Sequence, residues 1–340
     1  MLLKIKSNKK LWEIFTRKEE YETLILDRHK RFSYFLSKYK DIFNPSVSRY
    51  LVKKGLLKIE YPEKKGFAVC LTHDIDILRY KFSEKVKILL KGFKSLKFNP
   101  KILLSDLKRF NPLMNFEKII ETEKKFNAKS TFFFLSLRKD DFEFNYEIKR
   151  LKREIRFIID NGFEIGLQGG YDTFIDKERM IKEKNLLEDV AGKEVIGYRN
   201  HYLRFKIPET WENLKEAGFE YDSTLSYPHC VGFKNGMCHP FKPFNLNTDK
   251  FIDIFEIPLN IMDETIFTYM TFEPEDAWDI LKTIIDKTEE NNGVLTILWH
   301  NTNLSGERLK LYERILDYCF RKNAWITSCE NIWKFFIRIF

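Results

Sequence analysis

The sequence predicts an α/β fold, a distorted (β/α)7-type barrel with a helical extension at its N-terminus. From residue 67 onward, short apolar segments alternate with charged segments of helical periodicity. The apolar segments are nearly continuous, which indicates a parallel sheet covered by helices. No glycine-rich nucleotide-binding fingerprint follows any of them. Seven or eight such units therefore favour a barrel over an open doubly wound sheet.

The elements follow in chain order. Residues 1–65 are the predicted helical extension, because charged and aromatic residues recur there at three- and four-residue spacing. Residues 66–340 are the predicted barrel, with a basic helical insert at about 80–112 and a long loop at 226–250 expected over the active site. Strands are expected at 67–71, 130–136, 163–168, 194–198, 219–222, 254–259, 294–299 and 324–327. Helices are expected near 115–126, 146–160, 177–190, 208–217, 274–290, 307–321 and 329–338.

Composition and charge narrow the class of protein. The 340 residues are 44% hydrophobic, which excludes a wholly disordered chain. Lys and Arg (59) exceed Asp and Glu (50), and the excess lies mostly in the first 110 residues. This asymmetry predicts an anionic neighbour, such as a phosphorylated substrate, an acidic polymer or an anionic membrane surface. The alternative is a solvated, lysine-rich helical face. No nucleic-acid partner is expected.

Location is predicted from the termini and the cysteines. The first residues lack a secretory apolar region and cleavage site, and no window is long enough to span a membrane. The five cysteines are odd in number and scattered, which favours reduced thiols. We expect a cytoplasmic protein. We also expect that it can contact the inner face of the membrane peripherally. The amphipathic C-terminal segment is expected to dock on the core rather than on a membrane.

Polar side chains follow five of the predicted strands. They occur in the segments 72–76, 168–172, 199–201, 222–223 and 300–301. Because side chains alternate along an extended chain, Asp74 and Asp76 should lie on one side and His73 on the other. Two close carboxylates stay ionised only if a cation lies between them, and otherwise one takes up a proton. A divalent metal site with one Asp as ligand and the other as general base meets this demand, whereas the alternative is a helix cap.

Six ordered motifs carry a family resemblance: LTHDID, STFFFL, EIGLQGGYDT, GYRNHYLRF, FEYDSTLSY and LTILWHN. Together they resemble the polysaccharide deacetylase family, carbohydrate esterase family 4, also known as the NodB-homology domain. Within this family, the sequence resembles the subgroup whose first motif is T-H-D-[VI]-D. The resemblance covers about residues 66–335. It implies a distorted (β/α)7 barrel and metal-dependent removal of acetyl groups from N-acetylated sugars, in a surface-glycan or glycolipid pathway.

The resemblance also implies roles for single residues. Asp74 matches the catalytic base and Asp76 the metal-binding aspartate. Arg199 matches the arginine that orients the base, and His300 the histidine that acts as general acid. Asp222 matches the aspartate that tunes such a histidine. Elementary chemistry agrees, because amide hydrolysis requires an activated water, a stabilised oxyanion and a protonated leaving nitrogen.

The sequence departs from the family pattern at a metal-binding position. Gln168 stands where the family has a metal histidine, and a neutral amide is a weak ligand for zinc. The missing imidazole is expected from His201, or from His73 if the strand curls. The predicted metal ligands are Asp76, His201 and Asp172, holding zinc, or cobalt, nickel or manganese. The predicted substrate contacts are Gln168, Tyr171, His73 and Asn301.

Two other functions stay open at this point. One is a non-catalytic carbohydrate-binding relative that has lost its metal through Gln168. The other is a hydrolase of the same fold that acts on a non-sugar amide or on an O-acetyl ester. The presence of a base, an arginine and an acid together favours the deacetylase, because a pure binding protein has no need of an acid–base pair.

Overall fold

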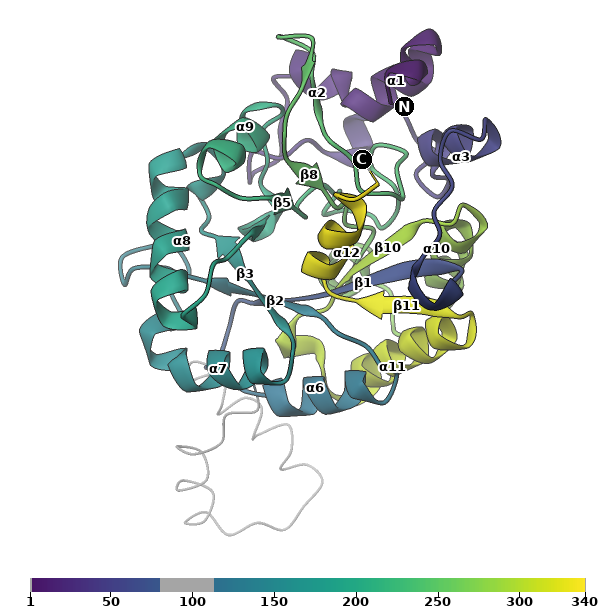
Figure 1. Cartoon of the computed structure of the whole chain (residues 1–340). Helices are drawn as coiled ribbons and strands as arrows, with labels where there is room; N and C mark the ends of the chain where they lie inside the picture. The colour runs from purple at the N-terminus through teal and green to yellow at the C-terminus, as the bar shows by residue number, and fades with distance from the viewer. Residues whose placement is uncertain (1, 80–112, 340) are drawn as a thin grey trace, which may run out of the picture.

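A computed structural model describes residues 2–79 and 113–339 of the chain, so the predicted insert at 80–112 lies outside the described residues. The main sheet is parallel throughout and curls into a half-barrel with the strand order β8-β5-β4-β3-β2-β1-β10-β9 (Figure 1). The strands are β1 (Phe67–Ile75), β2 (Thr131–Leu135), β3 (Glu164–Gly169), β4 (Gly197–Asn200), β5 (Tyr221–Asp222), β8 (Phe255–Glu256), β9 (Ile261–Met262), β10 (Val294–Leu298) and β11 (Ala324–Thr327). The predicted α/β barrel-type fold is confirmed.

Strand β1 is the centre of the sheet. All nine of its residues are buried, as the continuous apolar run in the sequence indicates. One edge of β1 pairs with β10. The other edge is shared, because residues 67–70 pair with β11 and residues 72–75 pair with β2. The long central strand therefore carries its last residues to the carboxyl end of the sheet.

Amphipathic helices cover the outer face of the sheet (Figure 1). They are α6 (Phe116–Lys124), η4 (Ile148–Leu151), α7 (Lys152–Asp160), α8 (Lys177–Ala191), α9 (Glu209–Glu216), α10 (Trp278–Glu290), α11 (Gly306–Arg321) and α12 (Cys329–Phe336). Short helical turns follow several strands: η5 (Thr173–Ile175), η6 (His201–Leu203), η7 (Thr265–Tyr269) and η8 (Asn301–Asn303). The turns η6, η7 and η8 carry side chains of the site described below.

The N-terminal residues form short helices, as predicted. They are η1 (Leu2–Ser7), α1 (Lys9–Thr16), α2 (Lys18–Glu22), η2 (Tyr34–Leu36), α3 (Ser46–Lys53) and η3 (Pro62–Lys64). Arg17 is fully buried between Glu19 and Glu20 and donates to the carbonyl oxygen of Lys234. This segment is therefore tied to the barrel by a buried charge network, and its boundary at residue 65 stays a prediction.

The loop at 226–250 differs in part from its prediction. It contains a small hairpin of β6 (Phe244–Asn245) and β7 (Lys250–Phe251). The carbonyl of Gly236 accepts from the backbone of α3, and the carbonyl of Cys238 accepts from Val294 at the amino end of β10. The expected position over the active site is therefore wrong for this central part. Its buried apolar side chains, Val231, Phe233, Met237 and Phe241 among them, hold it against the core instead.

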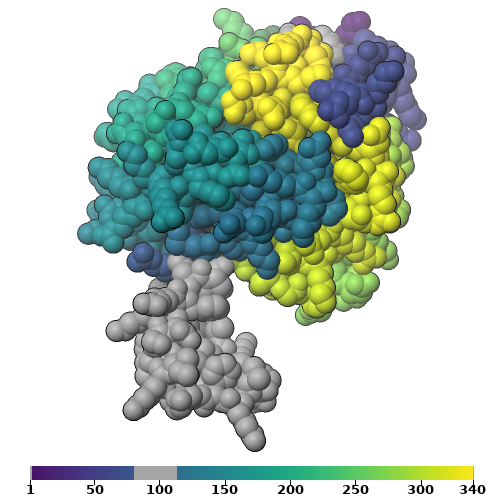
Figure 2. Space-filling view, turned by 60° about the horizontal axis from the view of Figure 1, so that its bottom comes forward, coloured from purple at the N-terminus to yellow at the C-terminus, as the bar shows by residue number. Residues whose placement is uncertain are grey.

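The C-terminal helix α12 docks on the core, as the sequence predicts, with Cys329, Ile332 and Phe336 buried. Figure 2 shows this helix in yellow beside the dark blue residues that precede β1, and the rings of Tyr61 and Phe335 stack with centroids 5.6 Å apart. In the part of the chain that the structure describes, no helix combines the length and apolarity that a membrane crossing requires.

Candidate active site

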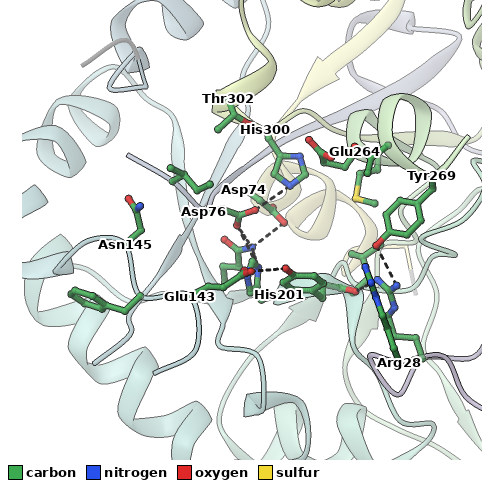
Figure 3. A pocket seen from close by; sticks show the side chains of 18 of the residues that line it. Arg28, Asp74, Asp76, Glu143, Asn145, His201, Glu264, Tyr269, His300 and Thr302 are labelled. Atoms are coloured by element: carbon green, nitrogen blue, oxygen red, sulfur yellow. Dashed lines mark hydrogen bonds and ion pairs between the residues drawn. The ribbon is translucent and has the colours of Figure 1, made fainter. Parts of the chain in front are cut away.

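A cavity of about 540 Å³ opens at the carboxyl ends of the strands (Figure 3). Residues from β1, β3, β9 and the turns after β4 and β10 line it, which is where a parallel α/β barrel gathers its chemistry. The lining includes Asp74, Asp76, Gln168, His201 and His300, five of the residues predicted from the sequence. The structure therefore brings these five side chains into one pocket.

Asp74 lies at the end of β1 with its carboxylate almost fully buried. Arg199 Nη1 donates to Asp74 Oδ1 at 3.2 Å and to Thr72 Oγ1 at 2.6 Å. Two further bonds, to the backbone carbonyl and the hydroxyl of Ser223, fix the guanidinium. Burial raises the pKa of Asp74, and the charges of Arg199 and His300 oppose that shift. The site thus holds a positioned carboxylate of increased basicity.

His300 follows β10 and is oriented by Asp263. Its Nδ1 lies 2.6 Å from Asp263 Oδ1, and its backbone N–H donates to Asp263 Oδ2 at 2.8 Å. The other ring nitrogen, Nε2, lies 3.4 Å from Asp76 Oδ2 on the pocket side. Burial disfavours the charged imidazole, but the carboxylates of Asp263, Asp76 and Asp74 outweigh it and raise the pKa of His300 to about 10. His300 therefore presents a proton to the pocket.

The predicted tuning of His300 by Asp222 is wrong. The Asp222 carboxylate is buried at the end of β5 and accepts from Thr224 Oγ1 at 2.5 Å. It also lies against Glu256, and burial together with the Asp222 carboxylate raises the pKa of Glu256 well above its usual range. Asp263, two positions after Ile261 of β9, takes the role instead.

Asp76, Gln168 and His201 form a second cluster in the same pocket. Gln168 Nε2 lies 2.7 Å from Asp76 Oδ1, 3.1 Å from His201 Nδ1 and 3.4 Å from Asp74 Oδ2. The other imidazole nitrogen, His201 Nε2, lies 3.1 Å from Glu143 Oε2. Burial lowers the pKa of His201, but Asp76 and Glu143 outweigh it, so the pKa is raised. The amide nitrogen of Gln168 thus stands at the point where three potential ligands converge.

The side chains of this cluster suit a divalent cation only with the amide oxygen turned inward. Among the described residues, no group of three His, Cys, Asp or Glu side chains is arranged as a metal site. Gln168 Oε1, however, is buried and has no hydrogen-bond partner. The two ends of an amide are nearly the same in shape, so turning it over puts Oε1 beside Asp76 and His201. A carboxylate, an imidazole and an amide oxygen then face one point, a mixed set that divalent metals accept.

Asp172 is not part of this cluster, so the predicted ligand set is wrong at that position. Its carboxylate is two-thirds exposed and accepts from Arg204 Nη1 at 2.6 Å. Tyr171, predicted to contact substrate, lies just before it, and its hydroxyl is 3.0 Å from His29 Nδ1. Neither residue lines the cavity. The chain turns outward after β3, which carries both away from the pocket.

Two more predicted substrate contacts are structural. His73 is fully buried on the opposite side of β1 from the two aspartates, between the carbonyl of Trp299 and the carboxylate of Glu123. Asn301 Nδ2 donates to the carbonyl oxygens of Ile77 and Leu113 and joins the loops after two strands. Both side chains are consumed by internal contacts, so neither reaches a ligand in the pocket.

Several residues in or next to the pocket were not predicted from the sequence. Glu143 and Asp263 orient the two histidines, and Arg28 and Arg31 reach the pocket from the N-terminal segment. Only Asp263 carries a signal in the sequence, because it lies shortly after an apolar stretch and 37 positions before its partner. The others come from loops, where no periodicity marks a position.

Comparisons with known proteins bear on the fold. No protein-family model matches the chain, and no curated protein does. A candidate polysaccharide deacetylase from Mycobacterium smegmatis is 20% identical with a TM-score of 0.57, over 83% of this chain and 93% of that one. A carbohydrate esterase family 4 pseudoenzyme from Bacillus anthracis is 11% identical with a TM-score of 0.43, over 80% and 66% of the two chains. Peptidoglycan deacetylase PdaC from Bacillus subtilis is 14% identical with a TM-score of 0.38, over 82% and 95%.

At this identity the similarity to the Mycobacterium smegmatis protein defines the fold alone. The chain has an α/β fold like that of a candidate polysaccharide deacetylase. The function of the chain is therefore inferred from the residues of the pocket.

Proposed function

We propose that the protein is a hydrolase that removes the acetyl group from an N-acetylated amino sugar, in a surface-glycan or glycolipid pathway. One observation carries the proposal. Asp74 and His300 meet the same cavity from the neighbouring strands β1 and β10, and each is held by a buried charge of its own, Arg199 and Asp263. Such a carboxylate and imidazolium are the base and the acid that amide hydrolysis requires.

The chemistry assigns one proton transfer to each side chain. Asp74 accepts a proton from the attacking water, and its burial-raised pKa makes it a stronger base than an exposed aspartate. His300 donates from Nε2 to the leaving nitrogen, while Asp263 holds the ring by Nδ1. Water adds to the acetyl carbon, the C–N bond breaks, and acetate and the free amine leave. Arg199 keeps Asp74 in place throughout.

The proposed function includes a bound divalent metal. Asp76, His201 and Gln168, the last through its amide oxygen, are the residues that would hold a divalent cation. When bound, such a cation polarises the acetyl carbonyl and lowers the pKa of a bound water. Zinc, cobalt, nickel and manganese are the ions to test. Glu143 orients His201 toward the pocket, the arrangement that metal-ligating histidines commonly have.

Asp74→Asn is the direct test of the proposed function. Acetate release from N-acetylated oligosaccharides should fall to background, because the amide keeps the shape of the side chain and removes its basicity. Circular dichroism should show an unchanged fold. Asp172→Asn is the matched control, since Asp172 is exposed outside the pocket, and it should retain wild-type acetate release. Wild-type rates in Asp74→Asn would place the base elsewhere and refute the assignment.

A second function is favoured by a specific contact. The amide nitrogen of Gln168 bonds to Asp76 and His201, the residues that would hold the metal. A pocket that binds a sugar without a metal could have this arrangement. A non-catalytic carbohydrate-binding protein would bind N-acetylated sugars and release no acetate with any of the four metals. The third alternative is a hydrolase of a different substrate class. Parallel assays with O-acetyl esters and non-sugar amides test it.

Peripheral contact with an anionic membrane extends the proposal, together with a cytoplasmic location. The five cysteines are free thiols. Three consecutive apolar side chains, Leu24, Ile25 and Leu26, are 97%, 66% and 46% exposed, and basic residues lie close to them in the sequence. Co-sedimentation with anionic vesicles should weaken as salt rises and be absent with neutral vesicles. Equal binding to both kinds of vesicle, or none, would refute this extension.

A further inference from the structure

The N-terminal segment contributes arginine side chains to one wall of the pocket. Some of their N–H donors have no carboxylate partner in the described chain. Arg28 and Arg31 both line the cavity, and Figure 3 shows Arg28 on the same side of it as Tyr269, opposite Asn145. These two arginines come from one tight turn, in which the carboxylate of Asp27 accepts from the backbone N–H groups of His29 and Arg31. The turn precedes the barrel in sequence but forms part of its pocket.

The turn is anchored firmly enough to position a ligand contact. Arg31 Nη1 donates to the carbonyl of Tyr202 at 2.8 Å, and Arg204 Nε donates to the carbonyl of His29 at 2.9 Å. His29 also contacts the hydroxyl of Tyr171. These contacts tie the turn to the loops after β3 and β4. A side chain on it therefore has a fixed origin relative to Asp74 and His300.

The two arginines differ in what they contact. The Arg31 guanidinium is nearly fully buried, and Asp27 neutralises it at 2.8 Å. Arg28 is exposed and lines the pocket, and its Nε donates to His29 Nε2 at 3.0 Å. Within residues 2–79 and 113–339, no carboxylate pairs with Arg28. Burial and the nearby charges of Arg31 and Arg28 lower the pKa of His29, so His29 is a neutral acceptor and does not offset the charge.

The carboxylates of the pocket are already engaged. Asp74 pairs with Arg199, and Glu143 with His201 and the hydroxyl of Tyr202. Glu264 accepts from Thr268 and Asn303. Asp76 accepts from Gln168 and lies near both histidines. Both Nη groups of Arg28 are thus left with hydrogens that no described carboxylate accepts.

We propose that Arg28 forms an anion subsite, and that the substrate is an acetylated sugar that carries a phosphate or carboxylate group at a distance from its acetyl group. This inference rests on the proposed function for the acetylated part of the ligand. A guanidinium with two free Nη groups binds an oxyanion through parallel hydrogen bonds, a geometry that matches phosphate and carboxylate. The N-terminal segment is then a specificity element of the site.

Binding measurements test the subsite without relying on turnover. Isothermal titration of the full chain carrying Asp74→Asn would compare N-acetylglucosamine 1-phosphate, N-acetylmuramic acid and neutral N-acetylglucosamine. We expect at least one anionic sugar to bind about tenfold or more tightly than the neutral one, because a hydrogen bond to a charged group contributes that much. A preference for phosphate alone, or for both anions, identifies the group that Arg28 accepts.

Variants of Arg28 decide whether it carries the preference. Arg28→Gln should abolish the preference and leave the affinity for neutral N-acetylglucosamine unchanged, and Arg28→Lys should keep part of it. Arg49→Gln removes an equal charge from the exposed face of α3, outside the cavity, and should change nothing. Absence of any preference, or a preference that survives Arg28→Gln, overturns the subsite. Preference without acetate release by the wild type refutes the proposed function alone, and release from neutral sugars without preference refutes the subsite alone.

Discussion

Two histidine–carboxylate pairs stand at the ends of neighbouring strands and share the same 2.6 Å separation. His73 in β1 pairs with Glu123 of α6, and His300 after β10 pairs with Asp263 after β9. In the first pair both imidazole nitrogens are used, because Nδ1 donates to the carbonyl of Trp299 and both side chains are fully buried. In the second, Nε2 faces the pocket. A ring nitrogen that faces a cavity, rather than the pair itself, distinguishes a reactive histidine from a structural one.

The largest effect is expected from removing Nε2 of His300, the nitrogen that faces the pocket. His300→Asn keeps a donor near the position of Nδ1 for Asp263 but has nothing in place of Nε2. Acetate release should fall by about 10²–10⁴-fold, the usual contribution of a general acid. Asp263 retains the donors of the residue 300 backbone and Asn303, so the melting temperature should change little. A variant with wild-type activity would show that the two pairs do not differ in the way proposed.

The buried pair should respond in the opposite way. His73→Leu leaves the Glu123 carboxylate in the core with only the hydroxyl of Tyr312 as partner. An uncompensated buried charge costs about 3–5 kcal/mol, so the free energy of unfolding should fall by that amount. Replacing both residues by Leu should restore a large part of it, and activity per folded molecule should stay near the wild type. Urea denaturation followed by fluorescence measures the first two quantities.

A buried carboxyl group without any imidazole partner sharpens the contrast. Glu164, at the amino end of β3, accepts from Thr131 Oγ1 and the backbone of Glu330, and burial raises its pKa to about 7. Because its pKa is higher in the folded protein than in the unfolded chain, its contribution is complete below about pH 4.5. It is lost as pH rises through 7, a difference of about 3 kcal/mol. Denaturation at pH 4.5 and 7.5 should show this loss in the wild type relative to Glu164→Gln. Parallel pH profiles for the two proteins would contradict it.

Much of the fold and part of the site were predictable from the sequence. The apolar run of β1 and the polar residues after each strand located Asp74, Asp76, Gln168 and His300 at the same end of the sheet. Alternation along β1 also puts His73 on the far side, where it contacts Glu123 instead of a substrate.

The site residues that the sequence did not predict correctly share a physical cause. Asp263 follows a strand of only two residues, and the apolar stretch before it is a weaker signal than the motif that contains Asp222. Side chains in loops are positioned by tertiary contacts that no local pattern encodes. Arg31 meets the carbonyl of Tyr202 across 171 positions, and Asp172 is drawn outward by Arg204. Sequence spacing predicts which residues reach the end of the sheet, but not which of them face each other.

His201 is intermediate between the two pairs, and it gives the last and smallest expected effect. One of its nitrogens is bound to Glu143, as in the buried pair, and the other faces Gln168 in the pocket, as in the reactive one. Gln168→His should add an imidazole to Asp76 and His201 and tighten zinc binding by about tenfold or more. Acetate release should rise or stay unchanged.

Isothermal titration with zinc measures this change, with Asp76→Ala as the variant that should abolish uptake. Asp172→Ala is the matched control, because Asp172 is bound to Arg204 outside the cavity, and its zinc affinity should equal that of the wild type. No uptake at micromolar zinc by the wild type, with none gained in Gln168→His, would show that the amide has replaced the metal rather than joined its ligands. Asp74 and His300 would then face a pocket in which Gln168 serves to hydrogen-bond a sugar.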